Sequence, residues 1–519
     1  MRRPRRAQRS IRLEGLEACT PASKIKIRGT LPASRNMTQL VRISRTRDGH
    51  WNGGDCVTVP GSSRIKGGTD NTECGDSAIV EEVGQLHGLV AAIVLRAPQL
   101  EVELELLARR LGNSLQNSSH PFEAECAVER FARGIRRCWL AAVNSAASLV
   151  YRSPTWSDAP LSVCGRRTDF GYERDLCPDV LEQRCATFFD PPLHDWADGH
   201  LLFSSGQAAM TAALWQADAH VSVSAPRPLK VAHVGSYFET RELLNLCPSL
   251  FQLLPGRDVA EADIFIVEPC GCERDNSCVY SQTTFANLSS SQRNARYIIV
   301  DSTLAGRQDG LSECLKCLEL QESTAVLRVH SGLKLFQAGL ELADVGILSV
   351  YSRQRDGHAS LMRQLRAMRT LLGIGLRFGD VAALEAPWFL DRQSSDPYEA
   401  AIRCHNMRLA TAVSAGKLFE LISHPNAPYC TFRLRDGSLE AYDALEKHLA
   451  EEVVKRRLLF DRGGSFGFRG HRYEVVRPQS EDPYLRVAMG GRGGWSCEGI
   501  TALFADISRM PRLPTHSPP

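Results

Sequence analysis

The sequence lacks the features of membrane, secreted and nucleic-acid-binding proteins. None of its apolar runs reaches the 18 or more residues that a membrane-spanning helix needs, and the run at 88–95 is far too short. The basic start at 1–6 is not followed by an apolar region, so it does not predict a secretory signal. The formal net charge is only +3, which gives no reason to expect nucleic acid or membranes as partners. We therefore expect a soluble, cytoplasmic protein.

The chain also lacks the cysteine pattern of a secreted disulfide scaffold. Its 17 cysteines are an odd number, and without a secretion signal they should stay reduced. Cys314 and Cys317, together with Cys270, Cys272 and Cys278, offer sulfur ligands that zinc accepts. Paired zinc ligands usually lie on tight turns, whereas the segment around Cys314 is typical of a helix. We therefore predict no metal site.

No internal repeat is present, and the chain divides by composition into five parts. At 519 residues, of which 43% are apolar, it can bury a large core and should form more than one domain. The expected parts are a basic, disordered extension (1–78), a helical segment (79–150), an arm (151–200), a large domain (201–375) and a small domain (376–519). For the first part three alternatives stay open: a start upstream of the true one, an organellar transit peptide, and a nucleic-acid-binding tail.

Short apolar runs in the large domain predict a buried parallel sheet. These runs lie at 230–234, 263–267, 297–300 and 325–328, and they are rich in β-branched residues. Strands buried on both faces have this composition. The pattern indicates an α/β fold with a mostly parallel central sheet.

Two polar residues after these runs suit pyridoxal phosphate (PLP). Asp301 ends one run, and Lys334 closes a Ser-x-x-Lys that begins at Ser331. A lysine amine can form a Schiff base with the cofactor aldehyde, and a carboxylate can keep the pyridine nitrogen protonated so that the ring accepts electrons. Most lysines are solvated surface charges, so this pair alone would be weak evidence.

Four further segments supply groups that such a site needs. The segment 203–210 is typical of a strand, a tight turn and a helix start, which would present backbone N–H groups to a phosphate. Tyr237 could stack on a flat ring. Tyr172 and Arg174 supply a phenol and a guanidinium ahead of a helix, and Arg486, in a short strand-like run, could bind a carboxylate bidentately.

Taken in order, these segments resemble the Cys/Met-metabolism family of PLP enzymes, which includes cystathionine γ-synthase, cystathionine lyases and methionine γ-lyase. The family pattern is Tyr-x-Arg, Ser-Gly-Met-Ala, Tyr-Gly-Gly-Thr, Glu-x-Pro, Val-Asp-Asn-Thr, Ser-x-Thr-Lys, Ser-Leu-Gly and an arginine strand. The corresponding segments are Tyr172-Glu173-Arg174, Ser205-Gly206-Gln207-Ala208, Tyr237-Phe238-Glu239-Thr240, Glu268-Pro269, Val300-Asp301-Ser302-Thr303, Ser331-Gly332-Leu333-Lys334, Ser465-Phe466-Gly467 and Arg486. The resemblance covers roughly residues 165–510.

The resemblance implies the aspartate aminotransferase-like fold, PLP fold type I, with a smaller C-terminal α/β domain. It implies Lys334, Tyr237 and Asp301 as catalytic residues, and Arg486 and Ser465 as the residues that hold the substrate carboxylate. The implied cofactor-binding residues are Ser205, Gly206, Gln207, Tyr237, Asp301, Thr303, Ser331, Lys334, Tyr172 and Arg174.

The resemblance also implies an oligomer. In the family, the Tyr-x-Arg arm reaches the cofactor phosphate of a neighbouring subunit, so Tyr172 and Arg174 would complete a partner's site. A homodimer, or a tetramer built from such dimers, with shared active sites is the expected assembly.

Departures from the family pattern concern the substrate more than the cofactor. Leu333 replaces a threonine whose hydroxyl would contact the phosphate, and Cys272 stands about where the family has an asparagine beside the ring. The family's Glu-Ser after Ser-Leu-Gly is replaced by 468–472, whose basic side chains either face the pocket or are structural. We expect the cofactor chemistry to be retained and the substrate to differ.

These implications predict a PLP-dependent transferase or carbon–sulfur lyase that acts on an amino acid with a γ (or β) leaving group through a vinylglycine-type intermediate. The departures favour γ-replacement over elimination. The alternatives are a C–S lyase or aminotransferase on the same fold, and a catalytically silent PLP-fold scaffold. The joint presence of Lys334, Asp301, Tyr237 and Arg486 argues against the scaffold.

Overall fold

The computed structural model describes residues 71–513, apart from internal gaps, and the short strands β1 (Ile43–Arg45) and β2 (Trp51–Gly53). The gaps are 156–159, 191–194, 222–226, 236, 255–260, 271–294, 308, 312–314, 316–323, 424–425, 436 and 478–481. The chain divides into two compact units, and residues 64–519 all belong to the second. The predicted disordered extension over 1–78 lies largely outside the described residues.

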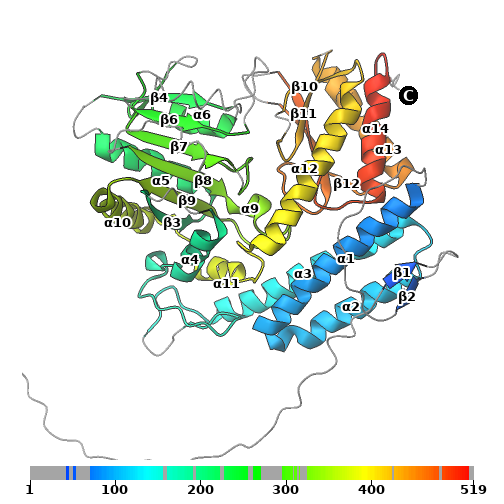
Figure 1. The fold of residues 1–519 in the computed structure, drawn as a ribbon, viewed down its shortest axis with the longest axis horizontal. Coiled ribbons are helices and arrows are strands. Elements are labelled where there is room, and N and C mark those ends of the chain that lie inside the picture. The colour runs from blue at the N-terminus through cyan, green and yellow to red at the C-terminus, as the bar shows by residue number, and fades with distance from the viewer. Residues whose placement is uncertain are drawn as a thin grey trace, which may run out of the picture. The chain divides into compact units, whose positions relative to one another are not determined.

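A seven-stranded sheet forms the centre of the large domain (Figure 1). Its strands, in spatial order, are β3 (Ala197–Phe203), β9 (Gly346–Ser352), β8 (Ala325–Ser331), β7 (Tyr297–Asp301), β6 (Ile264–Val267), β4 (Leu229–Val234) and β5 (Phe251–Leu253). Strands β8, β7, β6, β4 and β5 are parallel, and β9 runs antiparallel between β8 and β3. The four predicted apolar runs coincide with β4, β6, β7 and β8, which confirms a mostly parallel sheet.

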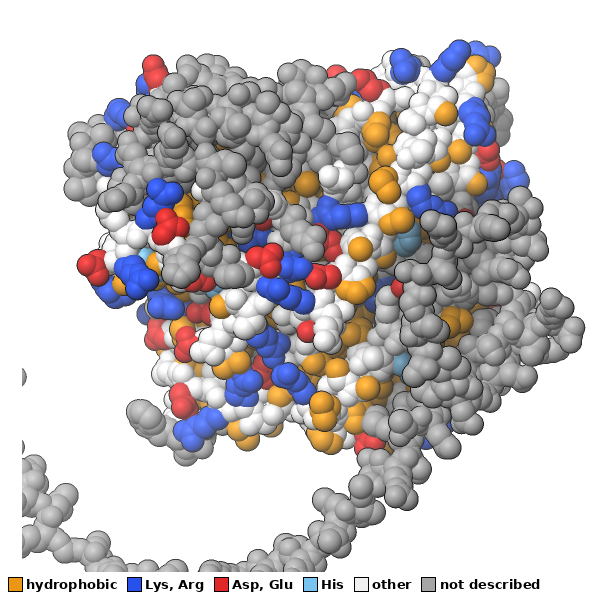
Figure 2. All heavy atoms as spheres, in the orientation of Figure 1, with side chains coloured by type: hydrophobic (Ala, Val, Ile, Leu, Met, Phe, Trp, Pro, Cys, Tyr) orange, Lys and Arg blue, Asp and Glu red, His pale blue; other side chains and the backbone are white. Residues whose placement is uncertain are grey.

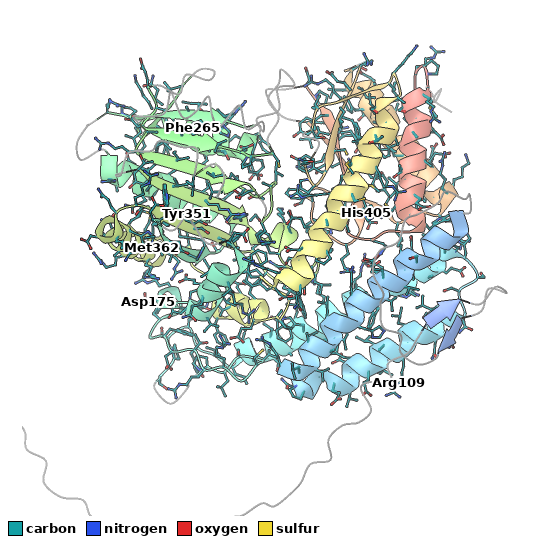
Figure 3. The ribbon with its side chains drawn as sticks, in the orientation of Figure 1. Arg109, Asp175, Phe265, Tyr351, Met362 and His405 are labelled. Atoms are coloured by element: carbon teal, nitrogen blue, oxygen red, sulfur yellow. The ribbon has the colours of Figure 1, made fainter. Side chains whose placement is uncertain are left out.

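Both faces of this sheet are buried, which is why its strands are mostly apolar. Ile264 and Ile266 face one core cluster, while Phe265 and Val267 between them face another. Figure 3 labels Phe265 among these strands. The helices around the sheet are α4 (Asp179–Phe188), α5 (Gly206–Val221), α6 (Phe238–Leu246), α9 (Gly332–Leu335), α10 (Arg355–Leu372) and α11 (Phe378–Leu384).

A second, five-stranded sheet follows in the C-terminal part of the chain. Its spatial order is β10 (Phe419–Leu421), β11 (Cys430–Leu434), β14 (Tyr484–Ala488), β13 (His471–Val476) and β12 (Phe460–Arg462). Its helices are α12 (Arg392–Ser414), α13 (Leu439–Arg456) and α14 (Trp495–Arg509). Alternate residues such as Phe432, Leu485 and Val487 pack into a core with these helices, so the residues between them lie on the opposite face.

Helices α1 (Asn71–Arg96), α2 (Glu101–Gln116) and α3 (Pro121–Ser148) pack together before the arm. By length and composition alone, the helical stretch Ser77–Arg96 could cross a membrane. Core helices of soluble proteins pass the same test. In this structure Leu86 and Ile93 of the helix are fully buried.

A buried group of charges joins these N-terminal helices to the C-terminal part of the chain. Glu82 of α1 accepts hydrogen bonds from Arg469 at 3.0 Å and from Arg492 at 3.0 Å. Arg492 also bonds Glu129 of α3 at 2.7 Å. Two carboxylates thus compensate two buried guanidinium groups. On the face that Figure 2 shows, positively and negatively charged side chains are interspersed among the described residues.

Candidate active site

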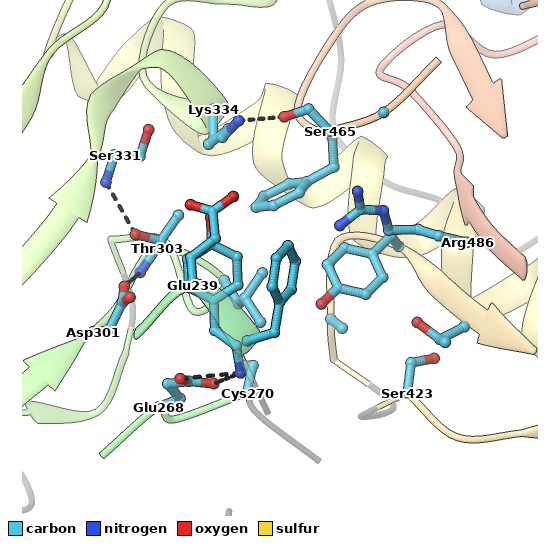
Figure 4. A pocket seen from close by; sticks show the side chains of 18 of the residues that line it. Glu239, Glu268, Cys270, Asp301, Thr303, Ser331, Lys334, Ser423, Ser465 and Arg486 are labelled. Atoms are coloured by element: carbon cyan, nitrogen blue, oxygen red, sulfur yellow. Dashed lines mark hydrogen bonds between the residues drawn. The ribbon is translucent and has the colours of Figure 1, made fainter. Parts of the chain in front are cut away.

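A cavity of about 550 Å³ lies at the carboxyl ends of the parallel strands, where the second sheet faces them. Open α/β sheets bind ligands at this edge, because the loops that follow parallel strands gather there. The lining residues include ten of the twelve predicted site residues, namely Ser205, Gly206, Gln207, Tyr237, Asp301, Thr303, Ser331, Lys334, Ser465 and Arg486. Figure 4 shows part of this lining.

Asp301 lies at the end of β7 and faces the cavity. One of its carboxylate oxygens accepts the backbone N–H of Thr303 at 3.0 Å. Burial, and then the nearby Glu268 carboxylate, raise the pKa of Asp301 to about 6. The hydroxyl oxygen of Thr303 accepts the backbone N–H of Ser331 at 3.0 Å, which links the end of β7 to that of β8 (Figure 4).

Lys334 lies on the short helix α9, directly after β8. Its amine donates a hydrogen bond to the hydroxyl of Ser465 and lies 5.6 Å from the centre of the Phe466 ring. Burial, followed by the positive charge of Arg486, lowers the pKa of Lys334. A larger fraction of this amine is therefore neutral than for a lysine in water, as a nucleophile or a general base requires.

The turn before α5 brings the start of this helix to the cavity. The Ser205 hydroxyl accepts the backbone N–H of Ala208 at 3.1 Å, so it caps the start of this helix. Chain packing is tight here, because a Cβ on Gly346 would collide with the Ser205 carbonyl and one on Gly206 would lie 3.1 Å from the Ser331 Cβ. The N-terminus of a helix of this length attracts anions.

Tyr237 is held by acidic groups that the sequence did not single out as site residues. Its backbone N–H donates to the Glu268 carboxylate at 3.0 Å, and Glu268 also bonds His233 at 2.8 Å. Glu239 lies near the hydroxyl of Tyr237, and its carboxylate accepts the Gln207 side-chain amide at 3.1 Å. Burial, and then Glu239, raise the pKa of Tyr237, so the phenol stays protonated.

Arg486 reaches the cavity from β14 of the second sheet. It forms an ion pair with Glu474, its register partner on β13, and lies 5.7 Å from the centre of the Tyr429 ring. The sequence did not reveal Glu474, because only strand pairing brings the two side chains together. A carboxylate bound to Arg486 would therefore have to share or replace the hydrogen bond that Glu474 accepts.

Tyr172 and Arg174 are the two predicted site residues that do not line this cavity. Their side chains contact each other, with the Arg174 guanidinium 5.0 Å from the centre of the Tyr172 ring, and Tyr172 is 46% exposed. The expected role of this pair concerns the site of a second subunit, so it stays a prediction.

The basic residues of 468–472 do not line the cavity. Arg469 is buried against Glu82, and Arg472 lies over the Phe468 ring and bonds Glu341 at 3.0 Å. His471 is buried and accepts the backbone N–H of Gly490 at 3.0 Å. A substrate role is wrong for these side chains, because the turn after Ser465 directs them to structural partners.

Cysteines near the site give no metal centre among the described residues. Cys270 lines the cavity, but burial raises the pKa of its thiol to about 11, so it is neutral. Cys272, Cys278, Cys314 and Cys317 lie outside the described residues. Within the described ranges, one group could hold a metal ion by geometry, namely Cys177, Asp179 and Glu182.

The lining fits PLP. A helix start for the phosphate, a buried carboxylate for the pyridine nitrogen, an aromatic residue and a lysine with a lowered pKa are present in one cavity. The threonine donor that Leu333 replaces has no substitute among the side chains described above. The groups that would remain to contact a phosphate are Ser205, Ser331 and the backbone at Gly206.

No family model matches the sequence, and no curated protein matches it either. Among solved structures, it is similar to a cystathionine γ-synthase from Xanthomonas oryzae pv. oryzae in complex with cystathionine (14% identity, 71% of this chain and 99% of that chain, TM-score 0.47). It is also similar to CalE6, a methionine γ-lyase from Micromonospora echinospora (17%, 69% and 91%, 0.46), and to a cystathionine γ-lyase from yeast (15%, 71% and 98%, 0.47). These are enzymes that the sequence motifs resemble. Since the TM-scores lie below 0.5, the function proposed below depends on the cavity's own residues.

Proposed function

We propose that this protein is a PLP-dependent enzyme of fold type I that acts on an amino acid with a γ (or β) leaving group, with γ-replacement as the net reaction. One observation carries the proposal. Asp301 at the end of β7, Lys334 after β8 and Ser205 after β3 line the same cavity as Arg486 of the second sheet. A pyridine partner, a Schiff-base lysine, a phosphate site and a carboxylate site are the groups that such an enzyme needs.

The large domain would hold the cofactor. Ser205, Gly206 and Ser331 would contact its phosphate, Asp301 its ring nitrogen, and Tyr237 the face of its ring. When bound, PLP withdraws electrons from the substrate's α carbon. The raised pKa of Asp301 fits a carboxylate that lacks a cation and would gain one from a protonated ring nitrogen.

The remaining residues would handle the substrate and its protons. Arg486 would bind the α-carboxylate, and Lys334 would remove the α proton, since its lowered pKa keeps more of the amine neutral. Ser465 would keep that amine at the cavity wall through the hydrogen bond it accepts. The cavity volume, about 550 Å³, supports a reaction in which an amino acid and a nucleophile meet beside the cofactor.

We further propose a cytoplasmic homodimer, or a tetramer of such dimers, in which Tyr172 and Arg174 complete a neighbour's site. The exposure of Tyr172 supports this, because an aromatic side chain on an arm is available for such a contact.

The test uses purified protein saturated with PLP, O-acetyl-L-homoserine and a thiol in deuterated water. We expect exchange of the substrate's α proton and formation of a thioether. Lys334→Ala should abolish both, whereas Lys447→Ala, at an exposed position on α13, should not. Absence of exchange in the PLP-loaded wild type would refute the proposed function. Release of keto acid and ammonia without thioether would refute replacement and indicate elimination.

A further inference from the structure

The chain that follows Lys334 turns in an unfavourable backbone conformation. Ala338 and Glu341 have φ angles of +49° and +48°, in the left-handed region that side chains disfavour, and Gly339 has +69°. Such a backbone persists only where the surrounding structure holds it. The contacts of residues 337–341, called the lysine turn below, therefore bear on the position of α9, which carries Lys334.

Helix α3 supplies one of these contacts. The Nε of Arg136 donates to the Leu340 carbonyl at 2.8 Å, and its Nη2 donates to the Glu341 carbonyl at 2.9 Å. A planar guanidinium offers several N–H donors in a fixed geometry, so it can hold two neighbouring carbonyls at once. Arg136 thus ties the lysine turn to a helix 204 residues earlier in the chain.

Helix α1 supplies a second contact, which passes through Arg469. The Nε of Arg469 donates to Glu82 of α1 at 3.0 Å, and its Nη1 donates to the Ala338 carbonyl at 3.2 Å. A Cβ on Gly339 would lie 2.7 Å from the backbone N of Arg469, so the lysine turn packs directly against the segment that contains Arg469.

That segment, 465–469, touches Lys334 from the other side. Ser465 accepts the hydrogen bond of the lysine amine, and the Phe466 ring centre lies 5.6 Å from it (Figure 4). A Cβ on Gly467 would strike the Lys334 carbonyl, so the two backbones are in contact as well. Lys334 therefore lies between two segments, and the N-terminal helices hold both of them.

We propose that Arg136 of α3 and Glu82 of α1 are positioning residues for Lys334. Helices α1 to α3 would then belong to the framework of the active site, although they precede the part of the chain that resembles the Cys/Met-metabolism family. The inference goes beyond the proposed function, because it assigns a role to residues 71–148 and requires no cofactor.

The environment of the lysine amine depends on this support. Burial, followed by Arg486, lowers the pKa of Lys334, whereas the carboxylates of Asp344, Glu239 and Glu341 act to raise it. Release of the lysine turn would let the amine leave its buried place beside Arg486. Its pKa should then rise toward the ordinary value of a lysine.

The test measures the pH dependence of carbamylation of Lys334 by cyanate. It uses the full chain, treated with hydroxylamine and dialysed to remove any bound PLP, and peptide mass spectrometry locates the modified lysines. We expect Arg136→Met to raise the apparent pKa of Lys334 by at least about 0.5 unit, and Arg136→Lys, which keeps the charge and one donor, to raise it less. Arg137→Met, at the next exposed position of α3, should leave it unchanged. Lys447, exposed on α13, is the internal reference and should react alike in every variant.

Urea unfolding of the same variants separates positioning from a general loss of structure. Arg136 is exposed, so Arg136→Met and Arg137→Met should unfold at similar urea concentrations. An unchanged Lys334 profile in Arg136→Met, an equal shift in Arg137→Met, or a shift that appears only together with a loss of stability would each refute the inference. If the Lys334 profile shifts as expected while the protein neither binds PLP nor turns over substrate, the proposed function fails and the positioning role stands.

Discussion

The buried charges around Glu82 allow a stability prediction whose size follows from the structure. Glu82 is 6% exposed and accepts hydrogen bonds from Arg469 and Arg492. Burial acts to raise the pKa of Glu82, but the guanidinium groups of Arg492 and Arg469 outweigh it and lower the pKa from 4.5 to about 2. That difference corresponds to roughly 3 kcal/mol of stability. Removing one partner of a buried ion pair costs about 3–5 kcal/mol.

Glu82→Gln should therefore lower the free energy of unfolding at pH 7 by about 3 kcal/mol. Without the Glu82 carboxylate, Arg469 keeps the Ala338 carbonyl as an acceptor and Arg492 keeps Glu129. Urea unfolding followed by circular dichroism measures this change. Glu81→Gln, at the exposed neighbouring position, is the control and should change stability by less than about 0.5 kcal/mol.

The pH dependence of the same variant has a definite sign. A carboxyl group whose pKa is lowered on folding stabilises the protein above its unfolded pKa and loses that effect as the pH falls through the folded pKa. The stability gap between wild type and Glu82→Gln should therefore shrink as the pH falls from about 4.5 toward 2. A loss below about 1 kcal/mol at pH 7, or a gap that widens in acid, would refute the account of this cluster.

Three further predictions concern the site. PLP affinity should weaken as the pH falls through about 6, where Asp301 becomes protonated, and Asp301→Asn should remove this pH dependence. Titration with PLP, followed by absorbance, measures the affinity at each pH. An unchanged pH profile in the variant would count against Asp301 as the ring partner. Gly467→Ala should destabilise the protein by about 1–3 kcal/mol in thermal unfolding, because Gly467 has a φ of +83° and a Cβ there would strike the Lys334 carbonyl. The control Gly463→Ala should destabilise it less, since the nearest atom to a Cβ at that position lies 3.9 Å away. Equal destabilisation by the two variants would contradict this prediction. Arg174→Ala and Lys334→Ala should each be nearly inactive, yet co-expression should recover up to about a quarter of wild-type activity through hybrid dimers, and hybrids without recovery would show that Arg174 serves its own subunit.

Local sequence patterns were sufficient to predict site residues that lie at the end of a single strand. The apolar runs fixed the positions of β4, β6, β7 and β8, and parallel strands bring their carboxyl ends to one edge. Asp301 and Lys334 could therefore be assigned to one site without knowledge of the packing.

Pairings between distant segments could not be predicted in this way. Glu474 contacts Arg486 only because of the register of β13 with β14. Glu82 and Arg469 form an ion pair although most of the chain separates them in sequence. The basic residues after Ser465 were ambiguous because the direction of a side chain in a turn depends on its tertiary neighbours. Arg469 is directed away from the cavity because it pairs with Glu82 of α1.

The visible absorption spectrum of the purified protein tests the central claim most directly. Lysine-bound PLP is yellow, so the wild type should show a visible band that Lys334→Ala abolishes and Lys447→Ala keeps. Comparing the two lysine variants distinguishes PLP bound to Lys334 from PLP bound to surface lysines. A wild type that stays colourless after addition of PLP, or a Lys334→Ala variant with an unchanged band, would contradict the account.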